Sequence, residues 1–380
     1  MHSENKQHDI LTIVRWPVGG IRTYLRELLR QEVFDGVRFK IVMPRTDESV
    51  HLADEVSRTG VECVLTPNDS AALLRQTWIE SGRGRFCLLH AHGFTSAMTS
   101  YAVARARRLP LLLTAHDVFT KGQYQGARGE LKRRIVEAVL RRMDVIHAVT
   151  QDGAENLREF LPGVSKGPCR ITVIPHGINI DAFNGSSTRD VRQELHLEKN
   201  VSLFGFFGRF MAQKGFRTLV EAAAMLVRDG LGDAFRVVCV GGGGFVREDT
   251  AFIEQRGLKK QFEFLPFERH IGPSLKGVDV VVMPSLWEAS GLLAMEAMVC
   301  GTPLIASTCI GLQETIAGTP ARGVTPKDAS ALAEAMRAEM RSPSKGASRA
   351  FVPTAMQRFD ARNSFRALHS VYAELVRCGS

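Results

Sequence analysis

Short apolar stretches alternate along the chain with longer stretches whose apolar residues recur at helical spacing. The short stretches, bounded by Gly, Pro or polar residues, are typical of buried β-strands, and the longer ones are typical of amphipathic helices. We expect strands over Ile10–Trp16, Phe39–Met43, Val61–Leu65, Phe86–Leu89, Pro110–Thr114 and Val145–Val149, and again over Ser202–Phe207, Arg236–Val240, Phe262–Leu265, Val278–Met283 and Pro303–Ala306. Strands that alternate with helices form parallel sheets covered on both faces, so the pattern predicts an α/β fold that occurs twice.

The boundaries between the expected domains follow from breaks in this pattern. The segment Ile171–Asn179 is interpreted as the last strand and turn of the first half, and the polar segment Asn184–Asn200 as a linker. We therefore expect an N-terminal domain over residues 1–183 and a second domain over residues 184–354. A final helical pattern over Ala355–Val376 predicts a C-terminal helix within residues 355–380, after a break at Ser342–Ser348.

Composition narrows the class of protein. The chain has 380 residues, of which 44% are hydrophobic, and this length fits two or three domains. No apolar run is long enough to cross a membrane and the polar N-terminus has no signal peptide, so we expect a cytoplasmic protein, with or without peripheral contact to the inner face of a membrane. The seven cysteines form no C-x-x-C pair, which indicates a reducing compartment and no structural zinc.

A formal net charge of +9 favours anionic partners. A phosphorylated substrate, an anionic membrane and a nucleic acid would all satisfy this charge. The chain has no nucleic-acid-binding motif, no Lys/Arg tail and no interleaved aromatic residues, so we expect no nucleic acid as partner.

Candidate chemistry is concentrated in one stretch of the second half, Met283–Ser307, which reads as strand end, loop, helix and next strand. Glu288 lies in the loop and Glu296 within the helix, roughly 7–8 Å apart along the helix axis at 1.5 Å rise per residue. Between them lie the free backbone N–H groups of Ser290, Gly291 and Leu292, at the positive end of the helix, where a phosphate binds readily. A diphosphate there would leave one carboxylate for a group on either side. The alternative is that Glu288 only caps the helix and Glu296 is only a solvated side chain.

Two further loops of the second half carry candidate ligand contacts. Arg209 and Lys214 follow the strand that ends at Phe207, and both can reach a diphosphate from one loop. The glycine run that contains Gly242 follows the next strand and would let the backbone lie against a nucleotide. The alternative is that an isolated Arg and Lys at this spacing have no part in binding a ligand.

In the first half, Gly19 and Gly20 separate the first strand from a helix, where a glycine pair lets backbone approach a ligand closely. They do not form G-x-G-x-x-G, so a dinucleotide is not expected, and a simple tight turn is the alternative. His92, His116 and Asp117 follow two of the central strands, at the edge where α/β folds bind ligands. The alternative to a ligand-binding role is that these histidines only form hydrogen bonds within the protein. Their spacing fits no simple metal-ligand pattern, and no metal is expected.

The chain resembles the retaining GT-B glycosyltransferases of family GT4. The resemblance rests on Glu288-x7-Glu296 followed by AM..GTP, and on G-R-x-x-x-x-K-G over Gly208–Gly215. It spans nearly the whole chain, although His176 and Asn179 replace the Asn and Asp usual in the segment that closes the first domain. The resemblance implies two facing Rossmann-like domains with a deep cleft between them, and a last helix that crosses back to the first domain.

The resemblance also implies an activity and a set of roles. A sugar moves from a nucleotide-sugar donor, with UDP favoured, to a sugar or lipid-linked acceptor hydroxyl with retention of configuration, without a metal or other cofactor, in the synthesis of cell-surface polysaccharide, lipopolysaccharide or glycolipid. The expected roles are as follows: Arg209 and Lys214 on the diphosphate, Glu296 on the ribose, Glu288 with Ser290, Gly291 and Leu292 on the sugar, Gly242 beside the nucleotide, Gly19 and Gly20 on the phosphate, His116 at the reacting end, and His92 and Asp117 on the acceptor side. A GT-B nucleotide-sugar epimerase and a non-catalytic nucleotide-sugar-binding protein remain alternatives.

One strongly basic segment lies outside these motifs. Between Tyr101 and Met143 the chain is rich in Arg and Lys, and Leu131, Ile135 and Arg142 recur at helical spacing. A basic amphipathic helix can lie on an anionic membrane, whereas the plainer interpretation is a solvated helix face.

Overall fold

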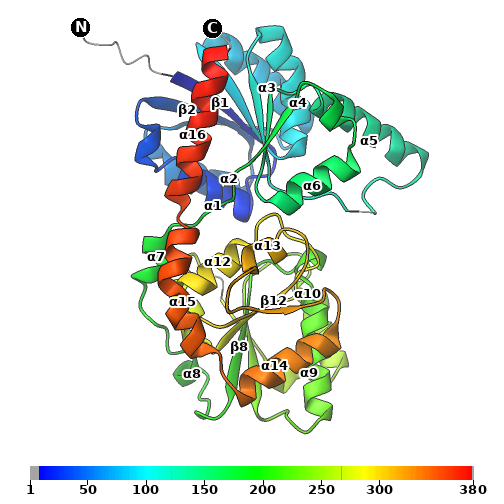
Figure 1. Ribbon diagram of the computed structural model, residues 1–380, viewed down its shortest axis with the longest axis vertical. Coiled ribbons are helices and arrows are strands. Elements are labelled where there is room, and N and C mark those ends of the chain that lie inside the picture. Colours follow the sequence, from blue (N-terminus) through cyan, green and yellow to red (C-terminus); the bar gives the residue numbers. More distant parts are fainter. Residues whose placement is uncertain (1–7, 121, 267, 379–380) are drawn as a thin grey trace. The chain divides into compact units, whose positions relative to one another are not determined.

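The structure is a computed structural model, and it describes residues 8–120, 122–266 and 268–378. These residues form two compact units (Figure 1). Unit 1 consists of the chain up to His176 together with the chain from Ala361 onward, and unit 2 is Gly177–Asp360. The polar N-terminus considered above falls mainly in residues 1–7, outside the described residues.

Unit 1 is built on a seven-stranded sheet whose described strand pairs are all parallel, in the order β3-β2-β1-β4-β5-β6-β7. The strands are β1 (His8–Val14), β2 (Val37–Pro44), β3 (Glu62–Thr66), β4 (Phe86–His92), β5 (Leu111–Ala115), β6 (Val145–Ala148) and β7 (Arg170–Val173). The helices are α1 (Gly20–Leu28), α2 (Asp47–Ser57), α3 (Ser70–Arg83), α4 (Phe94–Arg107), α5 (Gly126–Leu140), α6 (Gln151–Phe160) and α16 (Ala361–Cys378), with 3₁₀ turns η1 (Glu32–Phe34) and η2 (Val164–Lys166).

Both faces of this sheet are buried. Successive side chains of a strand point to opposite faces, and those of β1 divide accordingly. Ile10 and Val14 belong to a core shared with α16, whereas Leu11 and Ile13 belong to the core on the other face. Burial on both faces explains why the strands of this unit are continuous apolar runs rather than alternating ones.

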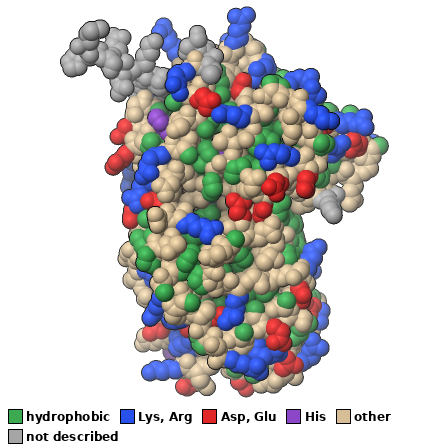
Figure 2. All heavy atoms as spheres, in the orientation of Figure 1, with side chains coloured by type: hydrophobic (Ala, Val, Ile, Leu, Met, Phe, Trp, Pro, Cys, Tyr) green, Lys and Arg blue, Asp and Glu red, His purple; other side chains and the backbone are tan. Residues whose placement is uncertain are grey.

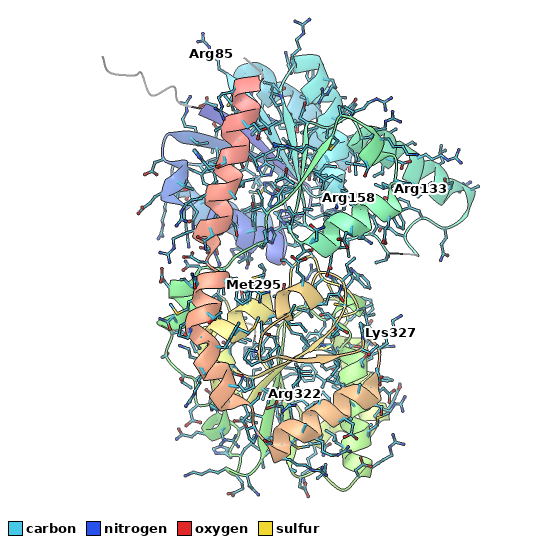
Figure 3. All side chains as sticks on the ribbon, viewed as in Figure 1. Arg85, Arg133, Arg158, Met295, Arg322 and Lys327 are labelled. Atoms are coloured by element: carbon cyan, nitrogen blue, oxygen red, sulfur yellow. The ribbon has the colours of Figure 1, made fainter. Side chains whose placement is uncertain are left out.

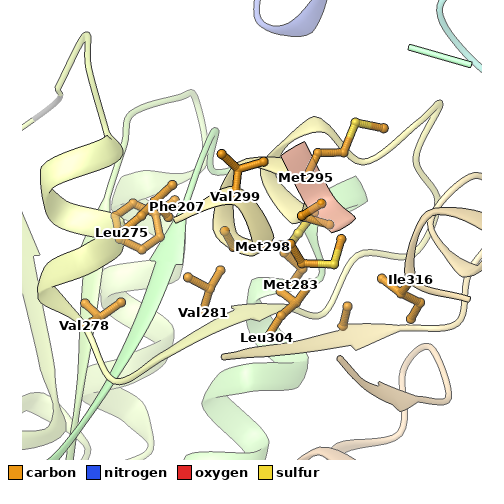
Figure 4. Packing of buried hydrophobic residues seen from close by; sticks show 14 of the residues in the cluster. Phe207, Leu275, Val278, Val281, Met283, Met295, Met298, Val299, Leu304 and Ile316 are labelled. Carbon is orange, nitrogen blue, oxygen red and sulfur yellow. The ribbon is translucent and has the colours of Figure 1, made fainter. Parts of the chain in front are cut away.

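Unit 2 repeats the plan with a six-stranded parallel sheet in the order β10-β9-β8-β11-β12-β13. The strands are β8 (Ser202–Phe207), β9 (Phe235–Val240), β10 (Phe262–Leu265), β11 (Val280–Met283), β12 (Leu304–Ser307) and β13 (Arg322–Val324). The helices are α7 (Ile180–Asn184), α8 (Val191–Glu194), α9 (Phe216–Arg228), α10 (Val246–Gln255), α11 (Gly272–Gly277), α12 (Leu292–Val299), α13 (Gln313–Ile316), α14 (Ala329–Arg341) and α15 (Lys345–Arg358), with 3₁₀ turns η3 (Ala212–Lys214) and η4 (Lys259–Gln261). One of its two cores is shown in Figure 4, where Met298 of α12 lies against Met283 and Leu304 of the sheet.

The expected α/β class with two Rossmann-like domains is confirmed. The compact units divide at His176/Gly177 and Asp360/Ala361, whereas the sequence placed the boundaries at 183/184 and 354/355. The expected linker over Asn184–Asn200 lies inside unit 2 and contains α8.

The prediction of a single C-terminal helix over Ala355–Val376 is wrong. The chain forms two helices there, α15 and α16, and α15 begins within Ser342–Ser348, where a break was expected. The reason lies at Phe359 and Asp360. The carbonyl of Phe359 accepts the backbone N–H of Ile178 at 2.8 Å, and Asp360 forms a parallel bridge with Ile178, so the chain leaves the helix there. Within the described residues, no helix is both long and apolar enough to cross a membrane.

Candidate active site

The strand order of each sheet reverses next to its first strand, because the chain first adds strands on one side and then moves to the other. In unit 2 this point lies between β8 and β11, and in unit 1 between β1 and β4. Ligands of open α/β sheets bind beyond the carboxyl ends of the strands at such a point. The loops that follow β8 and β11 are those that carry Arg209, Lys214 and Glu288.

In unit 2 these two loops are bonded to each other. The N–H of Leu286 donates to the carbonyl of Gln213 at 2.7 Å, and the Gln213 side-chain amide donates to the carbonyl of Trp287 at 3.0 Å. Gly215 has φ of +64°, and a Cβ added there would lie 1.9 Å from the carbonyl oxygen of Pro284. Only glycine fits this approach, so the G-R-x-x-x-x-K-G element ends in a residue that packs one site loop onto the other.

Lys214 and Glu288 form an ion pair at the junction of these loops. The distance from Lys214 Nζ to Glu288 Oε1 is 2.7 Å, and Ser285 Oγ donates to the same carboxylate oxygen, also at 2.7 Å. Glu288 is only 7% exposed, and a carboxylate this buried is stable when it is paired and hydrogen-bonded. The sequence assigned the two residues to different parts of a ligand and did not predict their contact or the part of Ser285.

Arg209 is the exposed cation of the same loop, and it has no hydrogen-bond or ion-pair partner among the residues that the structure describes. Its loop lies against the glycine run that follows β9. The N–H of Phe210 donates to the carbonyl of Gly242 at 2.8 Å. Gly241, with φ of +154°, could not carry a Cβ, which would lie 1.9 Å from the carbonyl oxygen of Gly208. The glycine run therefore supports the Arg209 loop, a contact that the sequence interpretation did not include.

Helix α12 begins where the sequence placed it. Gly291 is its N-cap in the left-handed conformation, with φ of +65°, and Leu292 is its first residue. The carbonyl of Ser290 accepts the hydroxyl of Thr315 at 2.7 Å, which fixes the turn before the helix. Glu296 lies half-buried in the second turn of α12, after Met295, which is labelled in Figure 3. Glu288 and Glu296 thus flank the N-terminus of α12 in sequence, as expected.

In unit 1, five histidines lie at or just past the ends of four neighbouring strands. They are His90, His92, His116, His147 and His176. Burial lowers the pKa of His147 to about 4, and burial together with the neighbouring histidines lowers the pKa of the other four well below the ordinary value. All five are therefore neutral near pH 7. Among the described residues, no group of three or more His, Cys, Asp or Glu is arranged to hold a metal ion.

A chain of hydrogen bonds crosses this cluster, and its proton positions can be assigned from one end. His147 Nε2 contacts the carbonyl oxygen of Ile174 at 2.8 Å; a carbonyl only accepts, so Nε2 carries the proton and Nδ1 does not. The hydroxyl of Thr114, 3.1 Å away, therefore donates to His147 Nδ1. Thr114 in turn accepts from His90 Nε2 at 2.7 Å, and Tyr372 of α16 donates to His90 Nδ1 at 2.6 Å.

The sequence singled out His92 and His116 from this cluster, and the structure brings them together: His92 Nδ1 lies 2.9 Å from His116 Nε2. It missed His90, His147 and His176. Signals exist for two of these residues. His90 is two positions from His92 on one strand, so the two share a face. His147 lies opposite Thr114, which lies opposite His92, on the adjacent strands β6, β5 and β4.

The other expected residues of unit 1 lie at the same edge. Asp117 is exposed, and its carboxylate accepts the N–H of Val118 at 2.9 Å. Gly19 and Gly20 are exposed at the start of α1, where Gly19 adopts φ of +54° and no side chain caps the helix.

Two family models match the chain, one in each half. The model described as Glycosyltransferase Family 4 matches residues 18–182, and the model described as Glycosyl transferases group 1 matches residues 202–341. The D-inositol 3-phosphate glycosyltransferase of Corynebacterium jeikeium (strain K411) is 28% identical over 312 residues, which is 77% of this chain and 73% of that protein.

Solved structures of the same architecture align over nearly the whole chain. Sucrose-phosphate synthase from Thermosynechococcus elongatus has a TM-score of 0.78 at 22% identity and covers 97% of this chain and 98% of its own. Anabaena HepE in complex with UDP and glucose has a TM-score of 0.79 at 19% identity, with 97% and 100% covered. The two Rossmann-like units define a GT-B glycosyltransferase. Within that class, the chain belongs to the group 1 glycosyltransferases of family 4.

Proposed function

We propose that this protein transfers a sugar from a UDP-sugar to an acceptor hydroxyl with retention of configuration and without a metal ion. The observation that carries the proposal is the cation-rich junction of the loops after β8 and β11. It combines an exposed Arg209 with no partner among the described residues, a Lys214–Glu288 pair at 2.7 Å, and the N-terminus of α12. UDP is proposed as the nucleotide because HepE, of the same fold, was solved with UDP and glucose.

Each group in this junction has a task on the donor. The planar guanidinium of Arg209 can bind two diphosphate oxygens at once. The ammonium of Lys214 has three N–H donors, so it can keep Glu288 Oε1 and still donate to a phosphate oxygen. These charges stabilise the negative charge that develops on the departing UDP, which is the main electrostatic need of the reaction. Glu288 and the N–H groups at the start of α12 then contact the sugar, and Glu296 the ribose.

The proposed chemical step is a substitution on one face of the sugar. The bond from C1 to the diphosphate oxygen breaks, and a bond from C1 to the acceptor oxygen forms on the same face. The leaving phosphate oxygen takes the proton of the acceptor hydroxyl, so no protein base and no metal is needed. His116, which is neutral, supplies a hydrogen bond to the sugar.

The exposed surface of helix α5 is the observation that favours a lipid-linked acceptor. On its exposed face Leu131 is 60% and Ile135 is 49% exposed, and both lie among the exposed cations Arg128, Lys132, Arg134, Arg141 and Arg142 of the helix and its C-terminal turn. Of its two acidic residues, Glu130 pairs with Arg133 and with Arg134 of this set, and Glu137 accepts the N–H of Gly163, so Arg128, Lys132, Arg141 and Arg142 keep no acidic partner on the helix. Figure 2 shows the Lys and Arg side chains over α5, the helix that carries Arg133 in Figure 3. We propose that this face lies on an anionic membrane where acceptors are held.

Thermal unfolding in the presence of UDP, GDP or ADP tests the donor, followed by product analysis with the corresponding UDP-sugars. UDP at about 100 times its Kd should add about 2.7 kcal/mol to the stability of the folded protein. Arg209→Ala should weaken UDP binding by about ten- to a hundredfold, since a hydrogen bond to a charged group contributes about 1.5–3 kcal/mol, whereas Arg247→Ala, an exposed arginine of α10, should not.

Three results would contradict parts of the proposal. Equal stabilisation by all three nucleotides would remove the preference for UDP. Loss of turnover with EDTA and its recovery with Mn²⁺ would show that a metal is required. Conversion of the donor sugar with no acceptor present would favour an epimerase.

A further inference from the structure

His92 is buried next to His116, and one of its ring nitrogens has no hydrogen-bond partner among the described residues. The side chain is 1% exposed, and its Nε2 is a buried atom without a hydrogen-bond partner among the described residues. Its other nitrogen, Nδ1, lies 2.9 Å from His116 Nε2. A neutral imidazole has a single N–H, so His92 places its proton either on the isolated nitrogen or in the contact with His116.

The surroundings of His92 favour the arrangement in which its proton lies in the contact with His116. A proton on His92 Nε2 would leave a buried N–H with no acceptor, and a buried donor without a partner loses its full hydration. A proton on Nδ1 is hydrogen-bonded, because it is donated to His116 Nε2. His116 is then an acceptor at Nε2, and its own single proton must be on Nδ1.

From this contact we infer that His92 is a positioning residue that sets the tautomer of His116, so that His116 offers a protonated Nδ1 to the ligand. His116 is half-buried, and its Nδ1 has no partner among the described residues and is not one of the atoms sealed from solvent. Nδ1 is therefore the nitrogen that can reach a ligand. In the opposite arrangement His116 would present a bare lone pair, which cannot donate to a sugar or phosphate oxygen.

Neighbouring groups keep both rings neutral and in place. Tyr24 lies against both, with ring centroids 5.8 Å from His92 and 5.1 Å from His116. His90 lies 4.1 Å from His92 and is itself fixed by Tyr372 and Thr114. Burial, and after it the neighbouring imidazoles, lowers the pKa of His92 and of His116, so neither acquires the second proton that would erase the tautomer.

Two isosteric variants separate donor from acceptor at position 92. The amide nitrogen of His92→Asn reaches about the position of His92 Nδ1 and can still donate to His116 Nε2. His92→Asp has the same size but only accepts, which forces the proton of His116 onto Nε2. Long-range ¹H–¹⁵N spectra of ¹⁵N-histidine-labelled protein distinguish protonated from bare ring nitrogens, and the signals of His116 are those lost in His116→Gln.

The wild type and His92→Asn should both show His116 with a protonated Nδ1 and a bare Nε2, and His92→Asp should show Nε2 protonated. A wild-type His116 protonated at Nε2 would overturn the inference, whatever the activity.

The effect on catalysis rests on the proposed function: His92→Asp should lower kcat about five- to tenfold relative to His92→Asn, the effect of about one hydrogen bond, while UDP binding in unit 2 is unchanged. If the spectra are as expected but the protein transfers no sugar, the proposed function is wrong and the tautomer assignment still holds. Equal kcat for the two variants of an active enzyme would show that the tautomer does not matter for transfer.

Discussion

Glu288 and Glu296 belong to one short segment, but their surroundings differ. Glu288 is 7% exposed and holds Lys214 and Ser285 through one oxygen, whereas Glu296 is half-buried inside α12. If Glu296 binds the ribose, its contact is the same before and during transfer, and Glu296→Ala raises KM for the donor with a smaller change in kcat.

Glu288→Gln should act mainly on kcat, because this side chain is proposed to contact the sugar, where charge develops. Glutamine keeps an oxygen for Lys214 and Ser285, so the loops stay bonded. Losses of roughly ten- to a hundredfold are expected for each variant, from about 1.5–3 kcal/mol per charged hydrogen bond. Free UDP carries ribose but no sugar, so its affinity should fall for Glu296→Ala only. Wild-type UDP affinity and kinetics in both variants would disprove the assigned roles.

The histidine cluster of unit 1 predicts that stability decreases on mild acidification. Each histidine binds its proton less readily in the folded protein than in the unfolded chain, where its pKa is about 6.5. The stabilisation from a neutral buried histidine is therefore complete above pH 6.5 and is lost as the pH falls toward the folded pKa. His147, with a folded pKa of about 4, accounts for a loss of about 3 kcal/mol over that interval.

Urea unfolding between pH 7.5 and pH 5, followed through unit 1, measures this effect. A stability of unit 1 that stays constant down to pH 5 would show that the cluster is not held neutral.

At the scale of the element, α5 combines exposed apolar side chains with exposed basic ones. Reversing two of its charges in Arg128→Glu/Lys132→Glu should abolish flotation with anionic vesicles at low salt, because each basic residue near such a surface contributes about 1 kcal/mol. The matched control is Lys199→Glu/Arg247→Glu, which makes the same charge change at exposed positions of unit 2. Equal flotation of both double variants, or no binding of the wild type, would leave α5 as an ordinary solvated helix.

The elements were predictable where burial alone decides the pattern. The central strands of both sheets were predicted because each is an apolar run buried on both faces, and the start of α12 because Gly291 adopts the left-handed conformation that glycine favours. The edge strand β13 is short and only partly buried, and it was not predicted. What could not be predicted depends on contacts across the chain. Lys214 and Glu288 are 74 positions apart, and Tyr372 reaches His90 across 282 positions. The end of α15 at Phe359 likewise depends on a partner, Ile178, far away in sequence.

At the scale of the molecule, we expect unit 1 to require α16 and unit 2 to fold without it. Phe365, Leu368 and Tyr372 are buried in the core of unit 1, and each such side chain stabilises the fold by about 1.5–3 kcal/mol. A chain that ends at Asp360 should therefore lose the unfolding transition of unit 1. Residues Gly177–Asp360, which contain both cores of unit 2, should fold alone and keep UDP binding.

Calorimetry and limited proteolysis of the shortened chains would check this. The control is a chain that carries Phe365→Leu in place of the deletion, which should weaken the transition of unit 1 without removing it. An intact unit 1 in the chain that ends at Asp360 would mean that its core closes without α16.

The bond between Ile178 and Phe359 has a consequence for how such a protein can be rebuilt. Because residues at the two ends of unit 2 are bonded to each other, the unit is an insertion whose two ends lie next to each other. One uninterrupted piece of gene therefore encodes everything that we propose to recognise the nucleotide. Exchanging that piece for the equivalent piece of another member of the fold would leave both junctions unchanged. We expect a chimaera made in this way to bind a different nucleotide while unit 1 keeps its own residues.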